Sequence, residues 1–89
     1  MKLRAEAKEM MYMFKQEVGV YNDLELMKKD FIDFLNDYRK NTDMIEKETI
    51  DFVISLNEDE FKDLVDNCNP KYIHKIVNGI LIEVPYWED

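Results

Sequence analysis

Several residue types that build active sites and stapled small folds are scarce in this sequence. The 89 residues include one cysteine, one histidine, two glycines and two prolines. A single cysteine excludes an internal disulfide, so the fold must be stabilised by packing. Gly19 and Gly79 are too few and too far apart for a glycine-rich loop that would cradle phosphate. So few glycines and prolines also predict short connections and much regular structure.

Few residues of the types that form catalytic or metal-binding sites are present. Ser55 is the only serine and lies in no nucleophile-elbow motif. His74 and Cys68 alone cannot complete a typical structural zinc site, and no EF-hand loop is present. Two carboxylates across a cleft would suffice for a hydrolase, but a chain this small without glycine-built loops rarely encloses a substrate. We therefore predict a protein that is not an enzyme and has no cofactor and no metal.

Long apolar runs are also absent, so no segment is predicted to span a membrane. Charged residues interrupt residues 2–9, which excludes a signal-peptide core there. At 46% hydrophobic and 36% charged residues, the composition is that of a globular chain. We expect one soluble domain covering residues 1–89 in a reducing compartment. The expected location is the cytoplasm, or the host cytoplasm if the protein is viral.

Negative charge is concentrated in one segment. Residues 1–40 carry eight acids and eight bases, whereas residues 41–69 carry nine acids and two lysines. Such a segment attracts basic surfaces and repels nucleic acid. Its acids are Asp43, Glu46, Glu48, Asp51, Glu58, Asp59, Glu60, Asp63 and Asp66.

Apolar residues at helical spacing predict three helices, at residues 2–17, 23–40 and 58–68. Gly19 can end the first helix with a positive φ. Asn22 with Glu25, and Asn57 with Glu60, have the spacing of capping boxes at the starts of the other two. The apolar stripes are Leu3, Ala7, Met10, Met11, Phe14 and Val18 in the first helix, Leu24, Met27, Phe31, Phe34, Leu35 and Tyr38 in the second, and Phe61, Leu64, Val65 and Cys68 in the third.

Residues 43–56 fit two patterns. Asp43 and Glu46 could cap a helix, and the apolar spacing slightly favours that interpretation. Residues 49–56 also alternate and are rich in β-branched side chains, which is typical of a strand. As a strand, they would extend the hairpin described next to three strands.

The sequence predicts a β-hairpin at residues 71–84. Asn78-Gly79 between two apolar runs is the strongest short hairpin signal. A two-residue turn pairs Val77 with Ile80 and places His74 opposite Glu83, where the two are expected to form a structural ion pair. Pro85 is expected to end the ladder.

The predicted fold class is therefore α+β. It is a small single domain, mostly helical, with three or four helices and a C-terminal antiparallel β-hairpin, and residues 49–56 are the candidate third strand.

Two sets of side chains are candidate partner-binding residues. On a helical wheel, Asp59, Asp63 and Asp66 point away from the apolar stripe of residues 58–68 and recur about once per turn, roughly every 5.4 Å. Charge on a short exposed helix is often only a solvated face. Tyr12, Leu26 and the tail pair Tyr86-Trp87 are expected to be exposed apolar residues, of the kind that form interface hot spots. The site residues predicted are Glu58, Asp59, Asp63, Asp66, Tyr86 and Trp87.

These features favour a non-catalytic acidic protein-binding domain that inhibits or regulates a basic, nucleic-acid-handling partner. Small acidic proteins without catalytic residues are common among virus-encoded inhibitors of host defence and nucleic-acid mimics. The first alternative is a homodimeric assembly module that uses the stripe from Leu24 to Tyr38. The second is a winged-helix-like DNA binder, although the Asn78-Gly79 turn carries no basic residue. Direct nucleic-acid binding and membrane binding are not expected.

Overall fold

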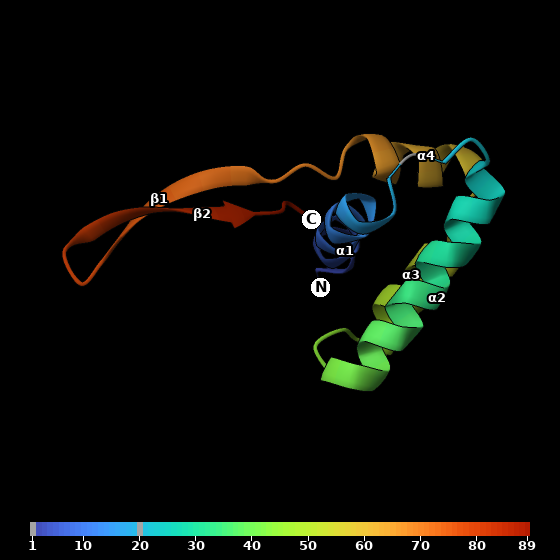
Figure 1. Cartoon of the computed structure of the whole chain (residues 1–89), viewed down its shortest axis with the longest axis horizontal. Coiled ribbons are helices and arrows are strands. Elements are labelled where there is room, and N and C mark those ends of the chain that lie inside the picture. The colour runs from blue at the N-terminus through green and yellow to red at the C-terminus, as the bar shows by residue number, and fades with distance from the viewer. Residues whose placement is uncertain (1, 20) are drawn as a thin grey trace.

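Four helices and one antiparallel hairpin make up the described part of the chain (Figure 1). The structure is a computed structural model that describes residues 2–19 and 21–89. It confirms the predicted α+β fold and the C-terminal hairpin. The elements are α1 (Leu3–Val18), α2 (Leu24–Thr42), α3 (Lys47–Ser55), α4 (Glu58–Asp66), β1 (Lys71–Val77) and β2 (Ile80–Tyr86).

Local signals in the sequence set most helix ends. The capping box at α4 is confirmed: the Asn57 side chain accepts from the Glu60 N–H at 2.8 Å, and the Glu60 side chain accepts from the Asn57 N–H at 2.9 Å. Gly19 follows α1 with a φ of 76°, as expected. The capping box predicted at Asn22 is wrong. Asp23 caps α2 instead, because its carboxylate accepts from the Glu25 N–H at 2.9 Å and a carboxylate satisfies these amides as well as an amide does.

Residues 43–56 contain a helix that begins later than predicted. Asp43 does not start it, because Asp43 ends α2 in the left-handed conformation with a φ of 55°. Thr49, Ile50 and Val53 are buried at helical spacing. The three-strand alternative is wrong, since the sheet formed by the described residues has only β1 and β2.

The core lies among the four helices, each of which packs against at least two others. The stripe from Leu24 to Tyr38 faces this core, with Met27, Phe31 and Leu35 buried. That stripe is therefore not free to serve as a dimer seam. Val18 lies beyond the core and is exposed, contrary to the predicted stripe. The buried apolar residues are Ala5, Ala7, Met10, Met11, Phe14, Met27, Phe31, Leu35, Ile45, Ile50, Val53, Leu56, Phe61, Leu64 and Cys68.

Side chains distant in sequence form hydrogen bonds with backbone groups at the ends of α1 and α3. Glu6 of α1 accepts from the Glu46 N–H at 3.2 Å and from the Thr49 hydroxyl at 3.0 Å, at the N-terminus of α3. The ammonium of Lys28 in α2 donates to carbonyls at the other end of α3. Asp89 accepts from two amides in the first turn of α1. Each charge has the sign that the helix dipole favours at that end.

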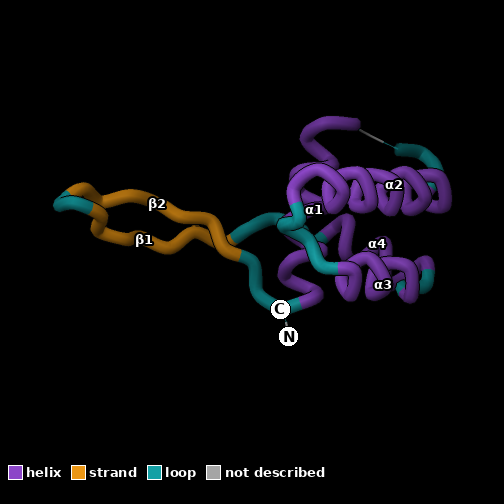
Figure 2. The backbone as a smooth tube through the Cα atoms, turned by 90° about the horizontal axis from the view of Figure 1, so that it is seen from below, coloured by secondary structure: helices purple, strands orange, loops and turns teal. Residues whose placement is uncertain are grey.

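The hairpin projects away from the helices in both views (Figures 1 and 2). Its register is as predicted, with Val77 opposite Ile80 and His74 opposite Glu83. The prediction that Pro85 ends the ladder is wrong. The strand pairing continues to Tyr86, which lies opposite Lys71. The turn residues Asn78 and Gly79 have φ values of 52° and 79°, which are those of a type I′ turn.

Candidate protein-binding surfaces

The predicted acidic face of α4 is exposed. Glu58, Asp59, Asp63 and Asp66 all reach solvent, whereas Phe61 and Leu64 on the opposite side are buried. The helical wheel drawn from the sequence is therefore confirmed. All nine acids of residues 41–69 are exposed. Among the described residues, one ion pair involves this segment, between Lys47 and Asp51 at 3.3 Å.

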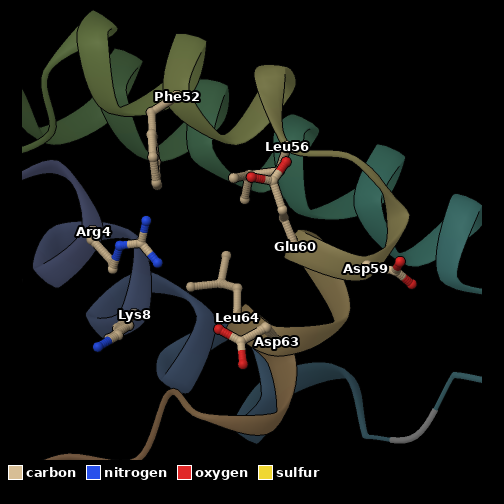
Figure 3. A pocket seen from close by; sticks show the side chains of 8 residues that line it. All are labelled: Arg4, Lys8, Phe52, Leu56, Asp59, Glu60, Asp63 and Leu64. Carbon is tan, nitrogen blue, oxygen red and sulfur yellow. The ribbon is translucent and has the colours of Figure 1, made fainter.

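The acids of α4 do not form one uniform surface. Asp59, Glu60 and Asp63 border a groove of about 260 Å³ whose opposite wall carries Arg4 and Lys8 of α1 (Figure 3). Its apolar lining comes from Phe52, Leu56 and Leu64, and the guanidinium carbon of Arg4 lies 5.8 Å from the centre of the Phe52 ring.

Two features of this groove argue against a specific ligand site. Its volume is below the roughly 300–1,000 Å³ of typical small-molecule pockets. Its opposed charges also shorten the reach of the acidic field on this side. Glu58 borders a different hollow, toward α2, beside Leu24 and Lys28. The predicted acids are thus divided between two sides of α4.

The aromatic tail is not free, contrary to the sequence-based expectation. Trp87 is half-buried, its indole N–H donates to the carbonyl of Cys68 at 2.8 Å, and its ring lies 5.9 Å from that of Tyr12. Tyr12 and Tyr86 are also half-buried, whereas Leu26 is exposed as predicted. Tyr86 and Trp87 lie at the base of the hairpin, so Trp87 anchors the hairpin to the helices and is already used inside the molecule.

Two ionic contacts reinforce this base. Lys71 pairs with Glu88 at 2.8 Å, which raises the pKa of Lys71 and lowers the pKa of Glu88. Asp89 accepts from the N–H groups of Arg4 and Ala5 at 2.8 and 3.0 Å, and these bonds lower the pKa of its carboxyl. The hairpin therefore leaves the bundle from a fixed base.

Beyond its base the hairpin is exposed on both faces. Because cross-strand partners share a face, the register sorts its residues into two sets. The lysine face, as we call it, consists of Lys71, Ile73, Lys75, Val77, Ile80, Ile82, Val84 and Tyr86. The histidine face consists of Tyr72, His74, Ile76, Leu81, Glu83 and Pro85.

Large apolar side chains on both faces reach solvent. Ile76, Leu81 and Ile80 are 75%, 66% and 65% exposed. Tyr72, Ile73, Val77 and Ile82 are exposed as well. Sequence reasoning missed this surface, although a signal was present: Ile76-Val77 and Ile80-Leu81-Ile82 do not alternate with polar residues. Apolar residues on both faces are typical of a strand that is covered on both sides.

The remaining chemistry-bearing side chains have structural surroundings. His74 and Glu83 lie in contact across the strands as predicted, with 3.2 Å between Nε2 and Oε1, and the contact is an ion pair only when His74 is protonated. Cys68 is buried as predicted, and this burial raises the pKa of its thiol, which disfavours the reactive thiolate. The described residues contain no group of three or more His, Cys, Asp or Glu side chains placed to hold a metal ion.

Two further findings bear on function. Within residues 2–19 and 21–89, no helix combines the length and the apolar character needed to cross a membrane. Comparison of the chain with protein-family models, curated proteins and solved structures found no match.

Proposed function

We propose that this chain is a non-catalytic protein-binding domain that holds its partner through the hairpin. The observation that carries the proposal is the set of seven large apolar side chains exposed on β1 and β2. Contiguous exposed apolar patches of this kind mark interaction sites, because a monomer gains nothing by presenting them to water. A two-stranded hairpin is also marginally stable alone, so covering it stabilises both the contact and the hairpin.

The acidic surface supplies the second part of the proposal. Its nine exposed acids create a long-range field that favours approach of a basic protein and disfavours nucleic acid. Such a field acts mainly on the association rate, whereas a buried apolar contact acts mainly on dissociation. The proposed partner is therefore a basic, nucleic-acid-handling protein, and occupation of its positive surface would inhibit or regulate it.

The test of hairpin binding is affinity capture from a cell extract treated with nuclease, using the double variant Ile76→Glu/Leu81→Lys. These residues are direct cross-strand partners on the histidine face, so the new charges face each other and support the hairpin while they remove its two most exposed large apolar side chains. The net charge of −8 is unchanged. We expect this variant to lose the captured partner.

A matched control is the exchange Lys47→Asp/Asp51→Lys. It also preserves net charge, and it alters an exposed ion pair far from the hairpin in sequence. We expect it to retain the partner. Equal capture by the wild type, the hairpin variant and this control would overturn binding through the histidine face of the hairpin.

The acidic surface is tested on the captured partner with the triple variant Asp59→Lys/Asp63→Lys/Asp66→Lys. We expect slower association, a weaker dependence on salt and little change in dissociation. Nucleic acid should compete with the wild-type protein for the same positive surface. Unchanged association and unchanged salt dependence would limit the acids to a role in solubility. Retention of the wild type on heparin at low salt would instead favour the DNA-binding alternative.

A further inference from the structure

The two edges of the hairpin differ in their capacity to accept another strand. In an antiparallel pair, alternate residues direct their N–H and C=O groups away from the partner strand. The two-residue turn closes on Val77 and Ile80. The outward-directed residues are therefore Tyr72, His74 and Ile76 on β1, and Leu81, Glu83 and Pro85 on β2.

Only β1 offers a complete edge. Each of its three outward residues has both a backbone donor and a backbone acceptor. On β2, Pro85 has no N–H, so that edge lacks a donor in its row. Proline at an outward edge position is a common means of preventing further strand addition. An added strand should therefore pair with β1 and not with β2.

We propose that the occupant of this edge is a second copy of the chain, with the two β1 strands antiparallel about His74. The result is a four-stranded sheet in the order β2-β1-β1-β2, related by a two-fold axis. This inference goes beyond the proposed function, because it concerns the strand edge and not the faces of the hairpin. It adds the third and fourth strands that an isolated hairpin lacks.

The sequence of β1 is self-complementary in this register. All seven residues of β1 are then paired, with Tyr72 opposite Ile76 of the second copy and Ile73 opposite Lys75. An aromatic residue opposite a β-branched one is a favourable cross-strand pair. Moving the register by two residues in one direction places Lys71 opposite Lys75, and in the other direction Lys75 opposite Lys75. Both shifts place two lysines opposite each other, whereas the register centred on His74 does not, so the register centred on His74 is favoured over them.

Charge favours the hairpin as the place where two copies meet. Residues 71–86 carry two lysines and one glutamate, whereas the whole chain has a net charge of −8. Antiparallel pairing places the two acidic bundles at opposite ends of the shared sheet. Seven residues of strand span about 23 Å, which exceeds the Debye length of about 10 Å at 0.1 M salt. The repulsion between bundles is thereby screened.

Because Pro85 removes a backbone donor from the edge of β2, the proposed assembly does not add further strands. After two β1 strands pair, both outer edges of the sheet are β2 edges that carry Pro85. A two-fold interface between identical edges generates a dimer and not a filament. The same proline that weakens one edge thus limits association to two copies.

The test compares His74→Pro with Glu83→Pro by sedimentation over a concentration series. Both positions direct their N–H outward, and both changes remove the same His74–Glu83 ion pair. They differ in the edge that loses its donor, and Glu83→Pro also changes the net charge from −8 to about −7. We expect a wild-type dimer, a dimer dissociation constant raised at least about tenfold by His74→Pro, and little change with Glu83→Pro. A monomeric wild type, or equal effects of the two prolines, would overturn the proposal.

A cross-linking measurement keeps the proposal testable if either proline unfolds the hairpin. In a Cys68→Ala background, His74→Cys places two cysteines directly opposite each other across the proposed axis. Their Cα atoms would lie about 5.5 Å apart, which suits a disulfide. We expect oxidation to give a covalent dimer with His74→Cys and none with Glu83→Cys. Equal cross-linking at both positions would contradict pairing through β1.

The two proposals can fail separately. A wild-type monomer that still captures a partner, and loses it with Ile76→Glu/Leu81→Lys, would remove the dimer and keep the proposed function. A dimer that captures no partner would do the reverse.

Discussion

The helical bundle and the hairpin differ in where their apolar surface goes. In the bundle, Phe31, Phe61 and Leu35 are almost completely buried, and side chains from neighbouring helices satisfy the ends of α3. In the hairpin, large apolar side chains are exposed on both faces, and the ties to the helices lie at its base. The bundle therefore gains its stability within the chain. The hairpin keeps large apolar side chains exposed to solvent, which supports its proposed role in binding.

Truncating one large side chain in each region gives the largest contrast. Phe31→Ala removes a ring with no exposed surface and should lower the free energy of unfolding by about 3–5 kcal/mol. Ile76→Ala, at the most exposed large apolar residue of the hairpin, should change it by no more than about 0.5 kcal/mol. Chemical denaturation at low protein concentration measures both. Similar losses would mean that the hairpin packs within its own chain.

The anchor between the two regions should have an intermediate effect. Trp87→Ala removes the contact with Tyr12 and the hydrogen bond to the Cys68 carbonyl, and we expect a loss of about 2 kcal/mol. Trp87→Phe keeps an aromatic ring and should lose only about 1 kcal/mol, the value of the hydrogen bond. The free energy of unfolding of the two variants separates packing from hydrogen bonding. A wild-type value for Trp87→Ala would show that the tail does not anchor the hairpin.

A substitution in the Asn78-Gly79 turn should destabilise the hairpin and leave the stability of the helical bundle unchanged. No atom lies within 4 Å of a Cβ built on Gly79, so the cost of Gly79→Val comes from its positive φ alone. We expect hairpin opening to become easier by about 1 kcal/mol or more. Hydrogen exchange of β1 and β2 amides should then accelerate about fivefold or more, while buried α2 amides keep their rates. Acceleration in both regions would mean that hairpin and bundle unfold together.

This separation also shows which parts of the fold the sequence predicts. The capping box of Asn57 and Glu60 and the Asn78-Gly79 turn act between near neighbours, so their spacing was sufficient. The caps supplied by Glu6, Lys28 and Asp89 join residues distant in sequence, and no local pattern indicates them. The helix cap at Asp23 was not predicted because Asn22 and Asp23 are adjacent and are both good N-cap residues. Spacing alone does not choose between them.

In the candidate site too, local features could be predicted from the sequence and features that depend on packing could not. Helical periodicity placed Asp59, Asp63 and Asp66 in solvent, and the structure confirms it. Periodicity could not show that Asp59 and Asp63 border the same groove as Arg4 and Lys8, because that depends on how α1 packs against α4. Nor could it show that both faces of the hairpin lack cover, since an apolar strand has the same sequence whether or not it is buried.

The smallest expected effect is that of acidification, which should weaken the hydrogen bonds between Asp89 and the first turn of α1. Two backbone N–H groups stabilise the charged form of Asp89 and lower the pKa of its carboxyl in the folded state. The stabilisation is therefore present above the unfolded pKa of about 3.9 and is lost as pH falls through the lower folded value. Below that pH, the Arg4 and Ala5 amides should shift in NMR spectra and exchange faster, by no more than about fivefold.

Asp89→Asn is the matched control for this titration. Its amide oxygen can still accept from both N–H groups but carries no titrating charge, so the Arg4 and Ala5 signals should lose their acid-dependent shift. The Lys71–Glu88 pair offers a comparison within the hairpin base, because the lowered pKa of Glu88 predicts a second release in the same acidic range. If the base clamps the hairpin, β1 and β2 amides near Lys71 and Tyr86 should respond to both titrations, while those beside the Asn78-Gly79 turn remain unchanged. A response that reaches the turn would show that the hairpin behaves as one unit with its base.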